Sequence, residues 1–231
     1  MCRRFILLIV ILVLNKFSSI AQVYDKKIIE AGHTLSEYNF YLFAKFDTAN
    51  VKLKDGRHTF IKMNFNLLLC KMEFISPVGD TLSVSKPEDI DTIYLHNNLF
   101  FYNKIWVQIL GGSDSVNIAI LRNISYDAVK IGAMGLASHA NGIQSYTSLD
   151  DGSGLRQLVM NEDVDITKET TYYLLHNNVE MIKATKLNFF KLFPKDKQRI
   201  ETYLKSQKIN YNKEMDLQKL LFFILHQPTQ A

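Results

Sequence analysis

The sequence is poor in cysteine, with only Cys2 and Cys70 among its 231 residues. Cys2 lies within the first 21 residues, a segment that we expect to be removed. A chain left with Cys70 alone cannot form an internal disulfide, so a hydrophobic core must hold the fold together. Cys70 follows three consecutive leucines, which favours a buried, unreactive thiol over a catalytic one.

Long apolar runs are also missing. The longest one we consider is Phe5–Leu14, and a bilayer-spanning helix needs roughly 20 residues. This run follows the basic residues Arg3 and Arg4 and precedes small residues that end at Ala21, which is the pattern of a secretory signal peptide. We therefore predict a signal peptide over 1–21, cleavage between Ala21 and Gln22, and no transmembrane segment in the mature chain. An uncleaved N-terminal anchor is the alternative.

The mature chain lacks a strong positive charge, because its basic and acidic residues are nearly equal in number. Removal of 1–21 lowers the number of basic residues from 27 to 24 and leaves the 23 acidic residues in place. The densest basic stretch, 183–208, is interrupted by Asp196 and Glu201. Proteins that bind polyanions normally present a basic stripe, so nucleic acid is an unfavoured partner.

Recognisable catalytic, metal and cofactor motifs are absent from the sequence. It contains no G-x-S-x-G elbow, no H-E-x-x-H zinc motif and no phosphate-binding glycine loop. The acidic cluster 161–165 lacks the internal glycine turn of a calcium loop. We therefore predict no cofactor, no metal and no catalytic residue, and we lean against an enzyme.

Short strands separated by turns fill the part of the sequence from Asn39 to about Tyr126, and Leu155–Met160 is a further predicted strand. The predicted strands include Asn39–Phe46 and Leu67–Ile75, and Gly111-Gly112 is part of a predicted turn. Asp55-Gly56 between two such runs is a strong hairpin signal. Tyr94–Asn98 resembles Tyr173–Asn178, and paired asparagines at both places indicate turns, because asparagine tolerates left-handed backbone. We predict an α+β fold whose antiparallel, β-rich body is a sandwich, a roll or a partly closed barrel, followed by a C-terminal helical segment.

Two further segments complete the predicted organisation. Residues 131–154 contain five of the ten glycines, and we interpret them as a long mobile loop within a β-rich domain over 22–179. After about Glu180 the apolar period becomes helical, clearest in Lys213–His226, so 180–231 is predicted as helices that pack on this domain or extend from it.

Two sets of surface residues are candidates for function. Aromatic residues on the predicted strands form a candidate binding surface: Tyr41, Phe43, Phe101, Tyr102 and Trp106. A recurring triplet of acid, hydroxyl and apolar residue resembles an O-glycosylation pattern of exported proteins of some Gram-negative bacteria. Its possible acceptors are Thr48, Thr81, Thr92 and Ser115.

The sequence also resembles a group of small exported proteins of Gram-negative bacteria. The segments that carry the resemblance are Tyr41–Phe46, Val51–Gly56 and Met63–Asn66 near the N-terminus, and Phe189–Pro194 with Ile200, Tyr203 and Asp216-Leu217 near the C-terminus. The resemblance implies an envelope address in the periplasm, at the cell surface or outside the cell. It carries over no functional residue.

The leading functional hypothesis is a non-catalytic cell-envelope protein that binds another envelope protein or a small ligand. An exposed aromatic patch would be its contact surface. The alternative is a secreted hydrolase or glycan-active enzyme, with 131–154 as its lid and titratable residues gathered in a pocket.

Overall fold

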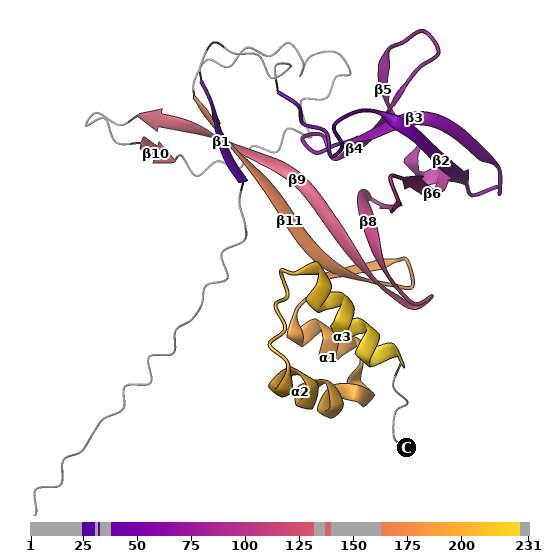
Figure 1. Ribbon diagram of the computed structural model, residues 1–231, viewed down its shortest axis with the longest axis vertical. Helices are drawn as coiled ribbons and strands as arrows, with labels where there is room; N and C mark the ends of the chain where they lie inside the picture. Colours follow the sequence, from indigo (N-terminus) through magenta and orange to yellow (C-terminus); the bar gives the residue numbers. More distant parts are fainter. Residues whose placement is uncertain (1–24, 31, 33–37, 132–136, 140–162, 227–231) are drawn as a thin grey trace, which may run out of the picture.

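The computed structural model describes residues 25–30, 32, 38–131, 137–139 and 163–226 of the chain (Figure 1). The predicted signal peptide and its cleavage site, nearly all of the glycine-rich segment 131–154 and an expected strand at 155–160 lie outside these residues. The described strands are β1 (Asp25–Ile29), β2 (Asp47–Leu53), β3 (His58–Asn66), β4 (Lys71–Ile75), β5 (Thr81–Ser83), β6 (Ile90–Leu95), β7 (Asn98–Asn103), β8 (Ile105–Gly112), β9 (Val116–Ile131), β10 (Ala137–His139), β11 (Val164–His176) and β12 (Glu180–Lys183). The described helices are α1 (Lys186–Leu192), α2 (Lys197–Ser206) and α3 (Glu214–His226), with short 3₁₀ turns at Pro87–Asp89 and Pro194–Asp196.

The described strands pair in the order β1-β11-β9-β8-β7-β6-β2-β3-β4-β5, with β10 beside β9 and β12 beside β11. Every pair is antiparallel, and the sheet does not close on itself. The C-terminal helices follow the last strand. The predicted fold class, a β-rich antiparallel body followed by helices, is therefore confirmed.

Tight turns connect most neighbouring strands of this sheet. Glycine and asparagine residues in the sequence predicted the positions of three of these turns. Gly56 has φ +88° in the loop between β2 and β3, a conformation that a residue without a Cβ adopts at little cost. His96 and Asn97 between β6 and β7, and Asn177 and Asn178 between β11 and β12, have φ between 49° and 62°. The two similar segments are therefore both left-handed hairpin turns, as predicted.

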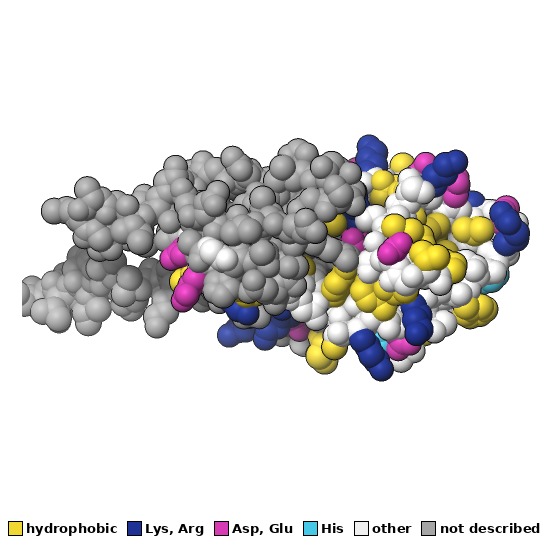
Figure 2. Space-filling view, turned by 90° about the horizontal axis from the view of Figure 1, so that it is seen from above, with side chains coloured by type: hydrophobic (Ala, Val, Ile, Leu, Met, Phe, Trp, Pro, Cys, Tyr) yellow, Lys and Arg dark blue, Asp and Glu magenta, His cyan; other side chains and the backbone are white. Residues whose placement is uncertain are grey.

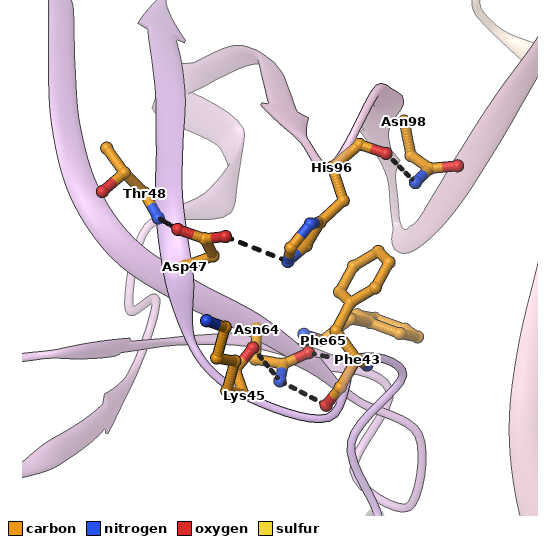
Figure 3. A network of polar contacts seen from close by, with 8 residues as sticks. All are labelled: Phe43, Lys45, Asp47, Thr48, Asn64, Phe65, His96 and Asn98. Carbon is orange, nitrogen blue, oxygen red and sulfur yellow. Dashed lines mark hydrogen bonds and ion pairs between the residues drawn. The ribbon is translucent and has the colours of Figure 1, made fainter.

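The segment Asn39–Phe46, predicted as a strand, differs in the structure. Only Tyr41 forms an isolated bridge, to Asn66, and the chain otherwise bends. Backbone hydrogen bonds join the Leu42 amide to the Phe65 carbonyl and the Leu67 amide to the Phe40 carbonyl (2.9 Å each). The fully buried side chain of Asn64 adds to them: its Nδ2 donates to the carbonyl oxygens of Phe43 (2.9 Å) and Lys45 (3.2 Å), and its Oδ1 accepts from the Phe43 amide (Figure 3). Backbone and side-chain hydrogen bonds therefore fix this bent segment against β3.

The predicted strand Leu67–Ile75 is shorter in the structure, where β4 begins only at Lys71. The Asn66 side chain accepts from the backbone amides of Leu68 and Leu69, which forms a turn over 67–70. Cys70 ends this turn with φ +53°. Local bonding by asparagine thus competes successfully with an apolar run that favours a strand.

The first core lies where β2, β3, β4 and β6 pack against the long strands β9 and β11. It contains Phe65, Phe100 and Trp106 together with Ile124 and Ile166. The rings of Phe65 and Phe100 stack with centroids 6.0 Å apart. The Ile124 amide donates to the Leu67 carbonyl (2.9 Å), so the sheet curves far enough for β9 to bond the turn before β4.

The second core lies between the three helices and the other end of β9 and β11, where Figure 1 shows the helices grouped together. Ile118 and Leu174 face each other across these strands and pack against Phe189, Leu220 and other buried helical residues. The helical part begins at Lys186, because Glu180–Lys183 is a strand of the sheet. The helices pack on the sheet, one of the two predicted arrangements.

None of the helices in the described residues combines the length and the apolar character that a bilayer-spanning helix requires.

Candidate functional site

An apolar groove of about 830 Å³ lies between α3 and the end of β8, and we call it the α3–β8 groove. Ligand sites in proteins typically occupy about 300–1,000 Å³ and are lined mainly by apolar side chains. Leu110 and Ile118 line the groove from the sheet, Tyr203 from α2, and Phe222 and Leu225 from α3. Size and lining both fit a site for a small apolar ligand.

The amphipathic pattern of α3 explains one wall of the groove. The predicted stripe of Leu217, Leu220, Leu221 and Ile224 is buried in the second core. The opposite face is only partly polar, because Met215 and Phe222 are 66% and 61% exposed. A helix that shows large apolar side chains on both faces leaves apolar surface available beside the groove.

A bulge in β8 shapes the other wall. Ile109 pairs with Ala119, but Gly111 pairs with Ile118, so Leu110 is an extra residue in the ladder. The Leu110 carbonyl accepts a hydrogen bond from the Gln218 side chain (3.3 Å), which links β8 to α3. The groove is thus positioned by a sheet irregularity and a helix that are distant in sequence.

Two glycines at the end of β8 also line the groove. At Gly112, a Cβ atom would lie 2.1 Å from the Val116 carbonyl oxygen, so only glycine fits the turn into β9. At Gly111, with φ +128°, a Cβ atom would meet nothing within 4 Å. Gly111 and Gly112, predicted as part of a turn, both belong to β8 in the structure.

Arg199 fixes the far side of α3. Its guanidinium lies 2.8 Å from Asp196 and donates to the carbonyl oxygens of Phe223 (3.3 Å) and Ile224 (2.9 Å). The same guanidinium covers the Phe223 ring, which stacks on Tyr203 with centroids 4.1 Å apart. The last turn of α3 is therefore anchored to α2, and the stacked rings of Tyr203 and Phe223 both line the groove.

A polar cluster marks the point where the two cores meet. Arg122 of β9 donates to Gln108 of β8, and its guanidinium lies 4.0 Å from Glu214 at the start of α3. Burial lowers the pKa of Arg122, and the nearby Glu214 opposes this effect. Burial, followed by the Glu214 charge, raises the pKa of Tyr172. These contacts position α3 on the sheet.

The aromatic candidates from the sequence do not form one surface. Trp106 is 3% exposed in the first core, with Tyr102 beside it at a centroid distance of 5.3 Å. Phe43 packs on His96 and Phe100, and the Tyr41 hydroxyl donates to the buried carboxylate of Glu73. Phe101 belongs to a third apolar cluster with Val107, Ala119 and Leu175. Phe43, Tyr102 and Trp106 therefore belong to the first core and Phe101 to the third cluster, and Tyr41 lies outside both.

The face seen in Figure 2 carries apolar side chains interspersed with lysine, arginine and acidic residues. Among the charged residues of the described chain, Lys52 pairs with Asp91 and Arg57 with Asp55, each at 2.7 Å. A smaller hollow of about 480 Å³ beside the β2–β3 turn is likewise lined by charged residues, among them Lys54 and Asp89. Neither feature offers the continuous apolar lining of the α3–β8 groove.

The proposed glycan acceptors differ in accessibility. Thr48 and Ser115 are exposed, whereas Thr81 and Thr92 are half-buried. Asp47 accepts from the Thr48 amide (2.7 Å) and lies 3.5 Å from His96. Figure 3 shows the Thr48 hydroxyl pointing away from His96, so these side chains do not align as nucleophile and base.

In the described part of the chain, no three His, Cys, Asp or Glu side chains gather as ligands for a metal ion. Cys70 is half-buried and its thiol contacts the Leu67 carbonyl oxygen at 3.7 Å. Burial raises its pKa to about 11, which disfavours the reactive thiolate at neutral pH.

Comparisons with protein-family models, with curated proteins and with solved structures found no match to the chain.

Sequence reasoning missed the groove residues Gln218, Lys219, Phe222 and His226. The sequence of Lys213–His226 could have indicated this face of the helix, because the large apolar residues Met215 and Phe222 fall outside its buried stripe. The contribution of β8 had no such signal, since the bulge at Leu110 depends on pairing with β9.

Proposed function

We propose that the protein is an exported, non-catalytic binding protein of the cell envelope, and that it holds a small apolar ligand in the α3–β8 groove. The observation that carries the proposal is the apolar lining of this groove, which is made by Leu110, Ile118, Phe222 and Leu225. Displacing ordered water from such a surface favours binding by about 25 cal/mol for each Å² of apolar area buried.

The export part of the proposal is supported by the sequence of residues 1–21. Expression of the full chain in a Gram-negative host, followed by N-terminal sequencing of the envelope fraction, tests it. We expect a mature chain that begins at Gln22. A full-length chain in the cytoplasm would contradict export and would leave the groove proposal intact.

The binding part of the proposal is tested with a neutral fluorescent probe, N-phenyl-1-naphthylamine, and the chain 22–231. We expect saturable fluorescence enhancement that the variants Leu110→Glu and Leu225→Glu abolish, because each places a charge within the apolar lining. Leu82→Glu on β5 is the matched control, since Leu82 is 47% exposed and lies outside the groove. Equal probe binding by all four proteins would contradict the proposal.

The alternative, a secreted hydrolase or glycan-active enzyme, requires titratable groups that converge on a reacting atom. The titratable residues that line the α3–β8 groove are Tyr203, Lys219 and His226. Tyr203 is stacked on Phe223 and His226 on Phe222. This arrangement supports binding more directly than catalysis.

A further inference from the structure

Lys219 is the one charged side chain among the described residues that line the α3–β8 groove. The described residues that line it include Lys219 and His226, and no aspartate or glutamate is among them. These two residues are seven positions apart and therefore lie on one face of α3, about 10 Å apart along the helix axis. Phe222 lies between them and stacks on the His226 ring with centroids 4.0 Å apart.

The acidic residues of α3 are engaged elsewhere. Asp216 accepts a hydrogen bond from the Asn210 amide (3.0 Å), and Glu214 lies beside Arg122 and Tyr172. Neither residue is part of the groove lining. Lys219 is exposed, and the described residues that line the groove include no acidic side chain of α3.

Hydrogen-bond donors also compensate the negative end of the α3 helix dipole. Carbonyl groups at a helix C-terminus repel anions. Here the Phe223 and Ile224 carbonyls accept hydrogen bonds from Arg199, and the Phe222 carbonyl lies 3.1 Å from Nδ1 of His226. An anion beside Lys219 lies farther from this end than one beside His226, since Lys219 is two turns earlier.

We infer that the ligand of the α3–β8 groove is a single-chain anionic amphiphile, of the free fatty-acid class, whose carboxylate is held by Lys219 while its apolar chain lies along Phe222 and Leu225. This inference rests on the proposed function and adds the chemical class of the ligand. Charge complementarity selects this class over a neutral or cationic amphiphile with the same chain.

The test is competition for the probe N-phenyl-1-naphthylamine by three ligands of equal chain length, used below their aggregation concentrations. Decanoate is anionic, 1-decanol is neutral and decylamine is cationic. We expect decanoate to bind the chain 22–231 about fivefold more tightly than 1-decanol, which is the size of effect expected for a partly desolvated ion pair, and decylamine to bind most weakly.

Variants of Lys219 distinguish the contribution of its charge from that of the apolar lining of the groove. Lys219→Gln is expected to weaken decanoate binding about fivefold and to leave 1-decanol binding unchanged, and Lys219→Arg is expected to retain the preference. Lys205→Gln, an exposed lysine of α2 outside the lining, is the matched control and should behave like the parent chain.

The outcomes distinguish the inference from the function on which it rests. Equal affinities for decanoate and 1-decanol, or equal losses for both ligands in Lys219→Gln, would overturn the inference while the groove still binds apolar ligands. Binding to phosphatidylglycerol vesicles without any binding of free decanoate would overturn it in favour of a membrane surface. Failure of the probe itself to bind would overturn the proposed function.

Discussion

The two cores of this protein differ in how completely they are enclosed. In the first core, strands of one curved sheet surround Phe65, Phe100 and Trp106 on several sides, and the buried polar groups beside it are bonded by asparagine and tyrosine side chains. In the second core, three helices cover one end of β9 and β11 but leave the α3–β8 groove at the margin. A sheet that curves over itself encloses its core, whereas helices that pack on the ends of two strands leave a groove between helix and sheet.

This difference indicates where binding is to be expected. In the first core, apolar side chains pack against one another and the buried polar groups beside them are hydrogen-bonded. A ligand would therefore have to displace these native contacts. The groove beside the second core has apolar surface that the described residues leave accessible, including Phe222 at 61% exposure. Four predictions test the comparison, and they follow in decreasing order of their effect on stability.

Removing one large ring from each core should destabilise the whole protein. Phe100→Ala and Phe189→Ala each delete a ring that is at most 2% exposed, and we expect each to lower the free energy of unfolding by about 3–5 kcal/mol. Because β9 and β11 run through both cores, urea unfolding should remain a single transition in both variants. Separate early loss of the helical circular dichroism signal in Phe189→Ala would show instead that the helices unfold independently.

The two glycines of β8 should respond unequally to alanine. Gly112→Ala places a Cβ atom against the Val116 carbonyl, and we expect a loss of about 3 kcal/mol. Gly111→Ala, with open space around its Cβ but with φ +128°, should cost about 1 kcal/mol. Thermal melts of both variants measure the difference. Equal losses would show that the close approach at Gly112 is relieved by movement of the turn.

The polar cluster at the junction should contribute less than either core. Arg122→Gln removes contacts to Gln108 and Glu214, and we expect a loss of about 1–2 kcal/mol. A double-mutant cycle with Glu214→Gln should show that part of this loss depends on their interaction. Strictly additive effects would contradict a direct role for the Arg122–Glu214 pair in positioning α3.

The smallest expected effect on stability is that of Cys70. Its raised pKa of about 11, against 9.0 for the unperturbed thiol, predicts reaction with a thiol-specific disulfide reagent at pH 8 about a hundredfold slower than in the urea-unfolded chain. Because burial disfavours the Cys70 thiolate, the contribution of this thiol to the free energy of unfolding is fully present below pH 9 and is lost as the pH rises through about 11. Cys70→Ser should therefore leave the pH dependence of stability near neutrality unchanged. Equal reaction rates for the folded and unfolded chain 22–231 would contradict the burial of this thiol.

The sequence predicted the elements that local patterns determine. Asp55-Gly56 located the β2–β3 hairpin, the paired asparagines located two left-handed turns, and the leucine stripe located the buried face of α3. The prediction of a strand was wrong for Asn39–Phe46, where the chain bends and the side chain of Asn64, some twenty residues away, bonds the carbonyl groups of Phe43 and Lys45. Such partners are not visible in a local pattern.

The candidate site was less predictable for a related reason. Three of the aromatic candidates, Phe101, Tyr102 and Trp106, are strand residues, and strand aromatics are mostly used in cores, as Trp106 is here. The groove depends instead on the bulge at Leu110 and on its contact with Gln218, more than a hundred residues later. The sequence carried a signal only for the exposed face of α3, because Met215 and Phe222 fall outside the buried stripe of this helix.

The central claim, that the margin of the second core binds an apolar ligand while the first core does not, is tested most directly by methyl NMR of the chain 22–231 titrated with decanoate. The account predicts saturable shifts for the methyl groups of Leu110, Ile118, Leu221 and Leu225, which line the groove, and unchanged signals for Ile93 and Ile166 in the first core. Shifts of similar size in both sets, or no saturable shift in the groove, would contradict it.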